Sequence, residues 1–244
     1  ARLCDRVVAV SHSVARDLMA ARACSRDKLT VIHNGVDVDR FTPANRSARP
    51  AVMARLFPEV APEAAFLVGA AGNLRRIKNY HILVQAAALL SAHENMRFVL
   101  WGEGEERAAL ERDVQRLGLS SRFVLPGRAP SIAECLAGCD CFVQPSQSES
   151  FGLAAAEAMA SGVPVVASAV GGLTEIIEDG RSGLLVPAGD SRALARTIEY
   201  LATHPVVRLS LAAAARERIV AHFSLPDMVS QYLQMYAVLL QGGR

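Results

Sequence analysis

The sequence predicts an α/β fold built on a doubly wound parallel sheet. Short apolar runs, typical of buried strands, occur at residues 65–71, 98–101, 122–125, 141–143, 163–167 and 183–186. Stretches with helical periodicity lie between and after them, at about 79–92, 105–117, 131–137, 152–160, 173–177 and 191–203, with a further one through Val220. Strands that are apolar on both faces and alternate with helices indicate a parallel, Rossmann-like sheet covered by helices on both sides. Such sheets bind ligands outside the carboxyl ends of their strands.

The first 35 residues do not belong to this sheet in an obvious way. Residues 6–10 and 29–32 are predicted strands, and Ser11 is expected to cap a helix that runs to about Ala21. The sequence His-Asn-Gly-Val-Asp at 33–37 then interrupts the pattern, and a polar stretch follows as far as Pro50.

The composition is that of a globular protein that can form a core. Hydrophobic residues make up 51% and charged residues 20% of the 244 residues. Lys and Arg total 26 against 24 Asp and Glu, and this near balance argues against a nucleic-acid or other polyanion partner. No apolar run approaches the ~18 residues needed to cross a bilayer. The chain begins Ala-Arg-Leu-Cys, without an initiator Met or a signal-peptide pattern, so we expect a piece of a longer chain.

The five cysteines form an odd, sparse set, which indicates a reducing compartment. Cys135, Cys139 and Cys141 lie close together in the sequence and invite interpretation as a metal site. However, Cys135 falls in a predicted helix and Cys141 in a predicted strand, and no second pair follows with zinc-site spacing. We expect these three residues to be buried small side chains.

Two carboxylates, Glu149 and Glu157, stand eight positions apart across a predicted loop-to-helix junction. Glu157 is the only charged residue between Ser150 and Thr174, so this helix is too apolar to face water. An ionised carboxylate in such surroundings needs hydrogen-bond donors, and the hydroxyls of a sugar fit. The free N–H groups and positive dipole end of the first helical turn suit a phosphate. Because helical side chains lean toward the amino end, both carboxylates can flank one anion site, as ribose and hexose flank the diphosphate of a nucleotide-sugar.

This segment, with the Gly-Val-Pro-Val-Val block that follows it, resembles the E-x7-E region of the GT-B glycosyltransferases. The resemblance is to the retaining family 4, or glycosyl transferases group 1, and mainly to its C-terminal donor-binding domain. It implies that Glu149 meets the donor sugar and Glu157 the ribose, while the backbone amides around residues 151–153 stabilise the leaving diphosphate. The donor-binding candidates in this loop are Ser150, Phe151, Gly152 and Leu153.

A Gly-Asn-Leu-Arg-Arg-Ile-Lys-Asn segment after the first strand of the sheet is similar to the family's phosphate motif. Gly72 permits a tight turn, and Lys78 offers a mobile positive charge to the diphosphate. Asn73 stands where the family has Arg, so half of the expected cationic clamp is missing. Arg75 or Arg76 can substitute, and we favour Arg76. The predicted catalytic groups are therefore Glu149, Lys78 and Arg76.

Two further loops are candidates for the donor pocket. The Trp-Gly-Glu-Gly sequence at 101–104 lacks the third glycine of a dinucleotide fingerprint, so NAD binding is rejected on this ground. Gly102 is then either a residue of close approach to the donor or a plain turn. The Leu-Pro-Gly-Arg sequence at 125–128 resembles the loop that receives the nucleobase, through Gly127 and its neighbours. Three roles are open for Arg128: stacking on the base, contact with a phosphate, or solvation at the surface. The identity of the base is also open among uracil, guanine and adenine.

The Gly-Gly-Leu-Thr-Glu sequence at 171–175 resembles the family's Gly-Gly-x-x-Glu segment and is expected to support the donor pocket. For Glu175 we favour a helix-start carboxylate, stabilised by the helix dipole, over a ligand. Asp37 and Asp39 mimic the Asp-x-Asp metal motif of a different glycosyltransferase fold, but they lie in the expected linker. The family's Asn-Gly-Val-Asp sequence, at 34–37, is interpreted as a turn. No divalent metal or cofactor is expected, because Lys, Arg and helix amides can neutralise the leaving diphosphate.

The resemblance covers essentially the whole chain and divides it into four parts. Residues 1–35 correspond to the tail of an N-terminal GT-B domain, 36–50 to the interdomain linker, 51–222 to the C-terminal nucleotide-sugar-binding domain, and 223–244 to a helix, at about 226–240, that crosses back to the first domain. The acceptor pocket is expected upstream of Ala1. The 244 residues alone should therefore bind donor weakly and show no turnover.

The predicted activity is transfer of a sugar from a nucleotide-sugar to an acceptor hydroxyl with retention of configuration, by a hexosyltransferase-type enzyme. The alternatives are a noncatalytic nucleotide- or nucleotide-sugar-binding module, a related GT-B epimerase or phosphorylase, and an assembly protein that has lost its ligand. The expected location is cytoplasmic, and attachment to the inner face of the membrane through the absent half stays open. Sugar, acceptor, linkage and oligomeric state are not determined by the sequence.

Overall fold

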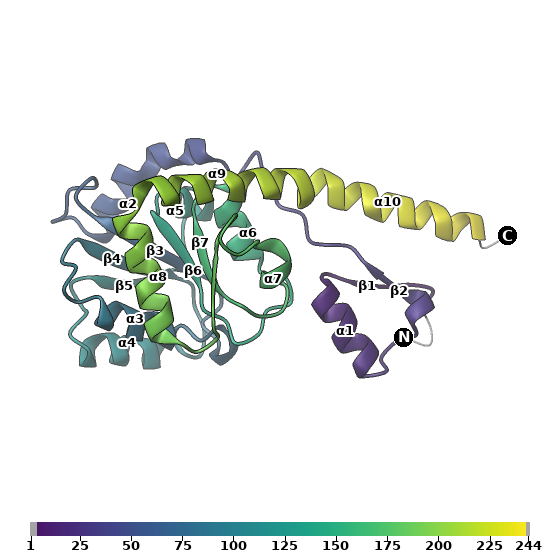
Figure 1. The fold of residues 1–244 in the computed structure, drawn as a ribbon, viewed down its shortest axis with the longest axis horizontal. Helices are drawn as coiled ribbons and strands as arrows, with labels where there is room; N and C mark the ends of the chain where they lie inside the picture. Colours follow the sequence, from purple (N-terminus) through teal and green to yellow (C-terminus); the bar gives the residue numbers. More distant parts are fainter. Residues whose placement is uncertain (1–3, 243–244) are drawn as a thin grey trace.

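The computed structural model describes residues 4–242, and its larger part is the doubly wound α/β fold that the sequence predicts (Figure 1). Six strands form one parallel sheet: β3 (Phe66–Ala71), β4 (Met96–Trp101), β5 (Phe123–Gly127), β6 (Cys141–Gln144), β7 (Val165–Ser168) and β8 (Leu184–Val186). Each corresponds to a predicted apolar run, with small shifts at the ends.

The strand order in this sheet is β5-β4-β3-β6-β7-β8. The chain therefore travels outward from β3 to one edge, returns to the centre at β6, and then travels outward to the other edge. The central strands pair through Val68 with Cys141 and Gly69 with Phe142. Because the loops that leave β3 and β6 diverge, a crevice opens at their carboxyl ends, and this is where doubly wound sheets bind ligands.

Helices cover both faces of the sheet (Figure 1). One face packs against α2 (Arg49–Leu56), α5 (Ile132–Ala137), α6 (Leu153–Ala160) and α7 (Leu173–Ile176); the other packs against α3 (His81–Leu89), α4 (Arg107–Arg116) and α8 (Ser191–Thr203). Side chains alternate between the two cores along each strand, as Leu67 and Val68 do in β3. The predicted burial of the cysteines is confirmed: Cys135 and Cys139 lie in one core and Cys141 in the other.

Some local elements differ from the predictions. The helix expected from residue 79 begins at His81, because Asn79 adopts a left-handed conformation (φ 55°) after a short 3-10 helix, η3 (Arg76–Lys78). The polar stretch that ends at Pro50 was not expected to be helical, yet it contains the 3-10 helix η2 (Pro43–Ala48) and the start of α2. Pro50 is accommodated there because the first helical turn has no use for its missing N–H.

The amino-terminal segment forms a separate small unit of β1 (Val7–Ala9), α1 (His12–Ala20), η1 (Arg26–Lys28) and β2 (Leu29–Val31), in which the two strands pair in parallel. The predicted cap is confirmed, since the Ser11 hydroxyl accepts a hydrogen bond of 3.1 Å from the Val14 N–H.

The turn predicted at 34–37 is wrong, because this segment is extended and bridges to the far end of the chain. The Val36 N–H donates to the Phe223 carbonyl (2.8 Å), and the Val36 carbonyl accepts from the Leu225 N–H (2.9 Å). The two backbones lie so close that a Cβ atom on Gly35 would approach the Leu225 Cα to 2.5 Å. Glycine is thus needed here for close contact between chain segments.

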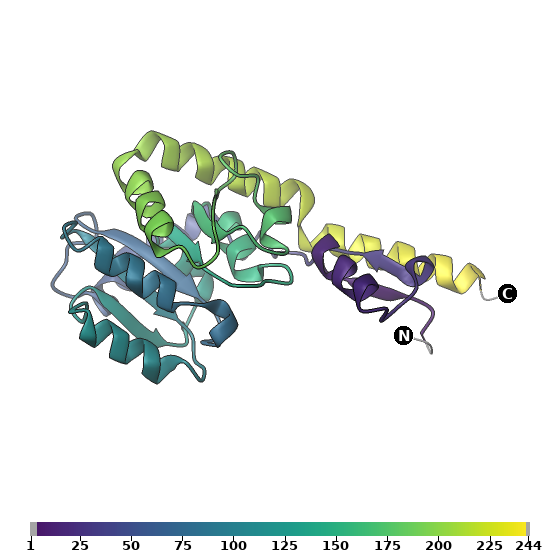
Figure 2. The same ribbon diagram turned by 60° about the horizontal axis from the view of Figure 1, so that its bottom comes forward.

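The chain ends in two long helices, α9 (Pro205–His222) and α10 (Leu225–Gly242), so the predicted C-terminal helix is confirmed. Figures 1 and 2 both show α10 leaving the large α/β body and running beside the β1–α1–β2 unit. A cavity between the two is lined by Thr30, Ile32, Gln231 and Met235. Within residues 4–242, no helix combines the length and the apolar character that a membrane span requires.

A buried carboxylate fixes the segment around residue 46 to the centre of the sheet. Asp140, directly before β6, accepts a hydrogen bond from the Leu67 N–H (2.9 Å). It also forms ion pairs with Arg46 (2.7 Å) and Arg49 (2.9 Å), although it is only 8% exposed. The two guanidinium groups and the amide compensate for the removal of this charge from water.

We expect replacement of Asp140 by alanine to lower the free energy of unfolding by about 3–5 kcal/mol, because it leaves Arg49 without its anionic partner. Urea denaturation of the wild-type and variant chains measures this difference. The matched control is Glu63→Ala, which removes an exposed carboxylate. Equal losses of stability in both variants would contradict an anchoring role for Asp140.

Candidate functional site

A cavity of about 490 Å³ opens at the carboxyl ends of β3, β4 and β5. Its walls come from the loops that follow these strands and from the first two turns of α6. The residues predicted for the donor site that line it are Gly72, Asn73, Lys78, Gly102, Arg128, Leu153 and Glu157. The fold therefore brings four separate segments of the sequence together around one space.

Another cavity, of about 540 Å³, lies at the opposite, amino ends of β4 and β5. Phe57, Arg97 and Arg122 are among its lining residues. None of the sequence motifs reaches it, and it is remote from the point where the strand order reverses. We therefore take the smaller cavity as the functional site.

Lys78 and Glu149 form an ion pair at the edge of this site. The Lys78 Nζ lies 2.5 Å from the Glu149 Oε2, and the exposed fractions of the two side chains are 24% and 12%. The same oxygen accepts hydrogen bonds from Gln144 Nε2 (3.2 Å) and Ser146 Oγ (3.3 Å). Glu149 is thus held in one orientation by three donors, with its charge neutralised by Lys78.

The loop that carries Glu149 is fixed from behind by the Gly171-Gly172 pair. The Gly172 N–H donates to the Glu149 carbonyl (2.9 Å). A Cβ atom on Gly171, whose φ is +49°, would lie 2.1 Å from the same carbonyl oxygen. The glycines allow this contact, by which the Gly-Gly-x-x-Glu segment supports the backbone of the Glu149 loop.

Glu157 has different surroundings from Glu149. It lies in the second turn of α6 and lines the cavity together with Asn73 and Arg128. Burial raises the pKa of Glu157 from 4.5 to about 7, although the positive charge of Arg40 acts in the opposite direction. A carboxylate whose pKa is shifted in this way by desolvation, in a cavity, is a candidate functional group.

The amino end of α6 points into the same region. Gly152 takes the N-cap position with a left-handed φ of 101°, and a Cβ atom there would meet the Leu173 side chain at 2.6 Å. Within the described chain, no side chain caps this helix and no acidic residue occupies its first turn. Its N–H groups and the positive end of its dipole are therefore available to an anion.

The glycines after β4 and β5 place the neighbouring loops in close contact. The Gly102 N–H donates to the Gly127 carbonyl (2.9 Å). A Cβ atom on Gly102 would lie only 1.8 Å from the Gly72 carbonyl oxygen. Close approach is therefore required at Gly102, and in the structure the partner is the adjacent loop.

Six predicted residues do not line the cavity in the described chain: Arg76, Gly127, Glu149, Ser150, Phe151 and Gly152. Arg76 is exposed on η3, and Ser150 is exposed in the loop before α6. The Phe151 ring is buried and packs against His33 (6.1 Å between ring centroids) and Phe223 (5.9 Å). Only the backbone of Phe151 is thus placed to face a ligand at the helix end.

Sequence reasoning missed the polar groups beneath the Glu149 loop. Gln144 and Ser146 are buried and contact Glu149. Tyr80 is also buried, its hydroxyl has no partner within residues 4–242, and burial, together with the charge of Glu149, raises its pKa. One signal was available: Gln144 is a polar residue at the end of an otherwise apolar strand.

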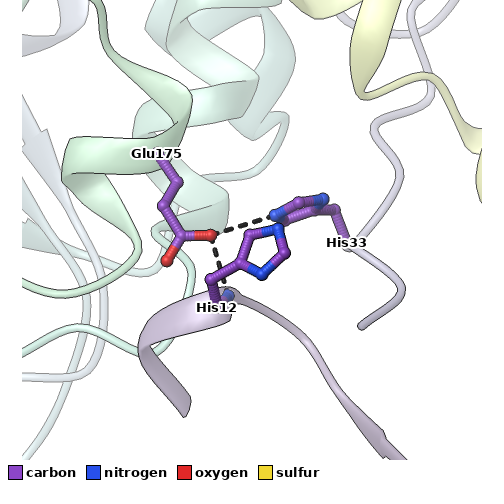
Figure 3. Close-up of side chains that lie close together, drawn as sticks. All are labelled: His12, His33 and Glu175. Carbon is purple, nitrogen blue, oxygen red and sulfur yellow. Dashed lines mark hydrogen bonds and ion pairs between the residues drawn. The ribbon is translucent and has the colours of Figure 1, made fainter. Parts of the chain in front are cut away.

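Glu175 makes contacts that the sequence did not predict (Figure 3). It lies in the first turn of α7, as expected, but its carboxylate reaches the amino end of α1. The oxygens accept hydrogen bonds from the backbone N–H groups of His12 (2.8 Å) and Ser13 (2.7 Å), and His33 Nε2 lies 3.1 Å away. Burial opposes ionisation, but these hydrogen bonds outweigh it and lower the pKa of Glu175 below its usual value.

Comparison with known proteins identifies the family of this chain. The family model described as glycosyl transferases group 1 matches residues 55–218, and the model described as Glycosyltransferase Family 4 matches residues 1–40. The D-inositol 3-phosphate glycosyltransferase of Salinispora arenicola is 34% identical over 247 residues, which cover 95% of this chain and 54% of that protein. The D-inositol 3-phosphate glycosyltransferase 1 of Catenulispora acidiphila is 33% identical, and the match covers 98% of this chain and 59% of that protein.

The solved structure of Anabaena Alr3699/HepE in complex with UDP and glucose superimposes with a TM-score of 0.87 at 26% identity, covering 97% of this chain and 64% of that one. This chain thus spans little more than half the length of the curated relatives it matches. Since the family model covers the whole sheet and the fold is that of GT-B enzymes, the chain belongs to the glycosyl transferases group 1 family.

Proposed function

We propose that this chain is the donor-binding half of a retaining glycosyltransferase that transfers a sugar from a nucleotide-sugar to an acceptor hydroxyl. The observation that carries the proposal is the arrangement at the reversal point of the sheet. The Lys78–Glu149 ion pair, the uncapped amino end of α6 and the desolvated Glu157 all border one crevice. Cation, helix dipole and two acids match a diphosphate with a hydroxylated group at each end.

We expect the diphosphate of the donor to replace Glu149 as the partner of Lys78. A diphosphate carries more negative charge than one carboxylate, so it competes for the ammonium group that Glu149 holds in the free protein. Glu149 keeps its hydrogen bonds to Gln144 and Ser146 and gains free lone pairs, which accept hydrogen bonds from the hexose hydroxyls. Glu157, on the other side of the amino end of α6, accepts from the ribose.

In the transfer step, the bond between the anomeric carbon and the phosphate oxygen breaks, and the electron pair stays on the diphosphate. The acceptor oxygen bonds to the anomeric carbon, and its proton passes to the departing phosphate oxygen. Lys78 and the amides at the start of α6 stabilise the charge that develops on the diphosphate. Because these groups are fixed in the fold, little reorganisation is needed when that charge appears. We place Arg76 as a secondary, outer cation, since it is exposed on the same loop.

The comparisons support a choice of substrates to test. Anabaena Alr3699/HepE has been solved with UDP and glucose, so UDP-sugars are the first donors to examine. The relatives named D-inositol 3-phosphate glycosyltransferases make a phosphorylated polyol the first acceptor class. Transfer itself is measured on the full-length protein, because the chain spans about half of those relatives. The free thiols of Cys24, Cys135, Cys139 and Cys141 support a reducing, cytoplasmic location.

The first test is the role of Lys78 in donor binding. We expect Lys78→Ala to weaken UDP binding by at least about tenfold, since a hydrogen bond to a charged group contributes about 1.5–3 kcal/mol. Calorimetric titration with UDP measures the affinity. Lys28→Ala is the matched control, because Lys28 contacts the carbonyl of Cys4 in the small unit, away from the crevice. Equal affinities in wild type and Lys78→Ala would refute the proposed diphosphate site.

Glu149 gives a test that separates sugar from nucleotide. We expect Glu149→Gln to leave the affinity for plain UDP unchanged or to raise it, because Lys78 is then free of its carboxylate partner. The additional affinity that the glucose of UDP-glucose contributes should fall by about tenfold, because the hexose loses a charged acceptor. Titration of both ligands into both proteins gives the comparison. A variant that retains the wild-type difference between UDP-glucose and UDP would disprove the sugar contact.

Glu157 gives a test by pH. Its folded pKa of about 7 lies above the reference value of 4.5, so the folded chain binds this proton more tightly than the unfolded chain. The contribution to stability is therefore full below pH 4.5 and is lost as the pH rises through about 7. Glu157→Gln, which mimics the protonated acid, should raise Tm at pH values above 7 and have little effect near pH 4.5. Glu105→Gln, an exposed change of the same charge, serves as the control; a pH-independent difference for Glu157→Gln would be contrary evidence.

A further inference from the structure

Two histidines and a glutamate meet at the joint between the small amino-terminal unit and the donor-binding body (Figure 3). His12 is the first residue of α1, His33 follows β2, and Glu175 lies in α7. One ligand atom from each of the three side chains lies within 4.8 Å of the other two. None of these residues lines the cavity assigned to the donor.

We propose that His12, His33 and Glu175 bind a transition-metal dication such as Zn²⁺. Two imidazoles and one carboxylate form a ligand set that proteins use for zinc, with a remaining position for water. Imidazole nitrogen disfavours Mg²⁺ and Ca²⁺, which select oxygen ligands. This site is separate from the transfer chemistry and does not depend on the proposed function.

The carboxylate is already oriented by hydrogen bonds from the backbone. Ser13 N–H donates to Oε1 and His12 N–H to Oε2, and these bonds hold Glu175 at the amino end of α1. A carboxylate oxygen has room for two partners, so Oε2 can keep the His12 amide and offer its second lone pair to a metal. Backbone donors to a metal-binding carboxylate are the kind of outer contact that fixes ligand geometry.

The two histidines can complete the site with small movements. His33 Nε2 lies 3.1 Å from Glu175 Oε2, and ligand atoms on a tetrahedral zinc are about 3.4 Å apart. The His12 ring packs edge-on against the His33 ring, with 5.5 Å between centroids. His12 is exposed, and its ring nitrogens have no hydrogen-bond partner among residues 4–242, so the ring is free to rotate inward.

The charges around the site act both for and against a bound cation. Metal binding needs the His33 Nε2 as a lone-pair donor. The positive end of α1 and the guanidinium of Arg218, which donates to the Glu175 carbonyl (2.8 Å), disfavour a cation. Glu175 and Glu178, the ion-pair partner of Arg218, offset these charges.

A bound ion would link the two parts of the chain. His12 and His33 lie in the segment that matches the Glycosyltransferase Family 4 model, whereas Glu175 lies in the segment that matches the group 1 model.

Two other histidines also contact carboxylates, but within the described residues neither forms a cluster of two histidines and a carboxylate. His81 uses its two nitrogens for Asp113 and Glu106 on opposite sides of the ring, and His93 has the single partner Glu199.

The test is titration of the tag-free chain with metal in a non-chelating buffer. Calorimetry measures the binding of Zn²⁺, and visible absorption measures the binding of Co²⁺. We expect one ion per chain, Co²⁺ bands without a thiolate charge-transfer contribution, and a rise in Tm with metal concentration. His12→Ala and Glu175→Gln should each reduce the affinity by at least about 10-fold.

The matched control is His93→Ala, which removes an imidazole from an ordinary histidine–carboxylate pair and should leave the affinity unchanged. His12 is exposed, so His12→Ala is expected to fold normally, and circular dichroism checks this. Absence of binding by the wild-type chain would overturn the proposal. So would equal affinities in wild type, His12→Ala and Glu175→Gln, or thiolate bands that assign the ion to cysteine.

Discussion

The reversal of strand order between β3 and β6 is the constraint on which the site depends. Parallel strands must be joined by crossovers, and when successive crossovers run to opposite edges, the loops at the centre of the sheet separate. Large side chains on these loops would fill the space between them and close the crevice. Gly72, Gly102 and Gly171 instead let neighbouring loops pack against one another at the rim. The space that remains is lined by Lys78, Glu157 and the start of α6.

The two acids at this crevice have different surroundings. Glu149 lies among donors, with an ammonium, an amide and a hydroxyl around one oxygen. Glu157 rises from an apolar helix, and burial raises its pKa. In the function that we propose, a hydroxylated ligand replaces the donors around Glu149 and supplies donors to Glu157.

The loop that carries Glu149 is also connected to the amino-terminal unit. Phe151, which follows Glu149 in that loop, packs against His33, and His33 contacts Glu175. Glu175 in turn caps α1, and the Gly171-Gly172 pair just before it holds the Glu149 backbone. The contacts of α1 with the large body and the contacts of the Glu149 loop therefore form one connected set.

The local pattern of the sequence was sufficient for the sheet, because a strand buried on both faces must be continuously apolar and each helix must follow at its own period. It also singled out Glu149 and Glu157, because charged residues are rare around positions 149–174 and a buried carboxylate is costly without hydrogen-bond donors. Features set by distant partners were not accessible. Val36 is extended because it pairs with Phe223 and Leu225, and α2 is stable because Arg49 reaches Asp140.

The same distinction holds for single side chains at the site. Residue type and spacing identified Lys78 as a cation near the phosphate segment, but only the fold placed it on Glu149, 71 positions further along the chain. Glu175 was recognised as a carboxylate in a first helical turn, whereas the helix that it caps begins at His12. Short-range propensities depend on neighbours in sequence and can be read from them. Pairings between ionised or polar groups across loops depend on where the whole chain folds, so the tertiary structure alone decided them.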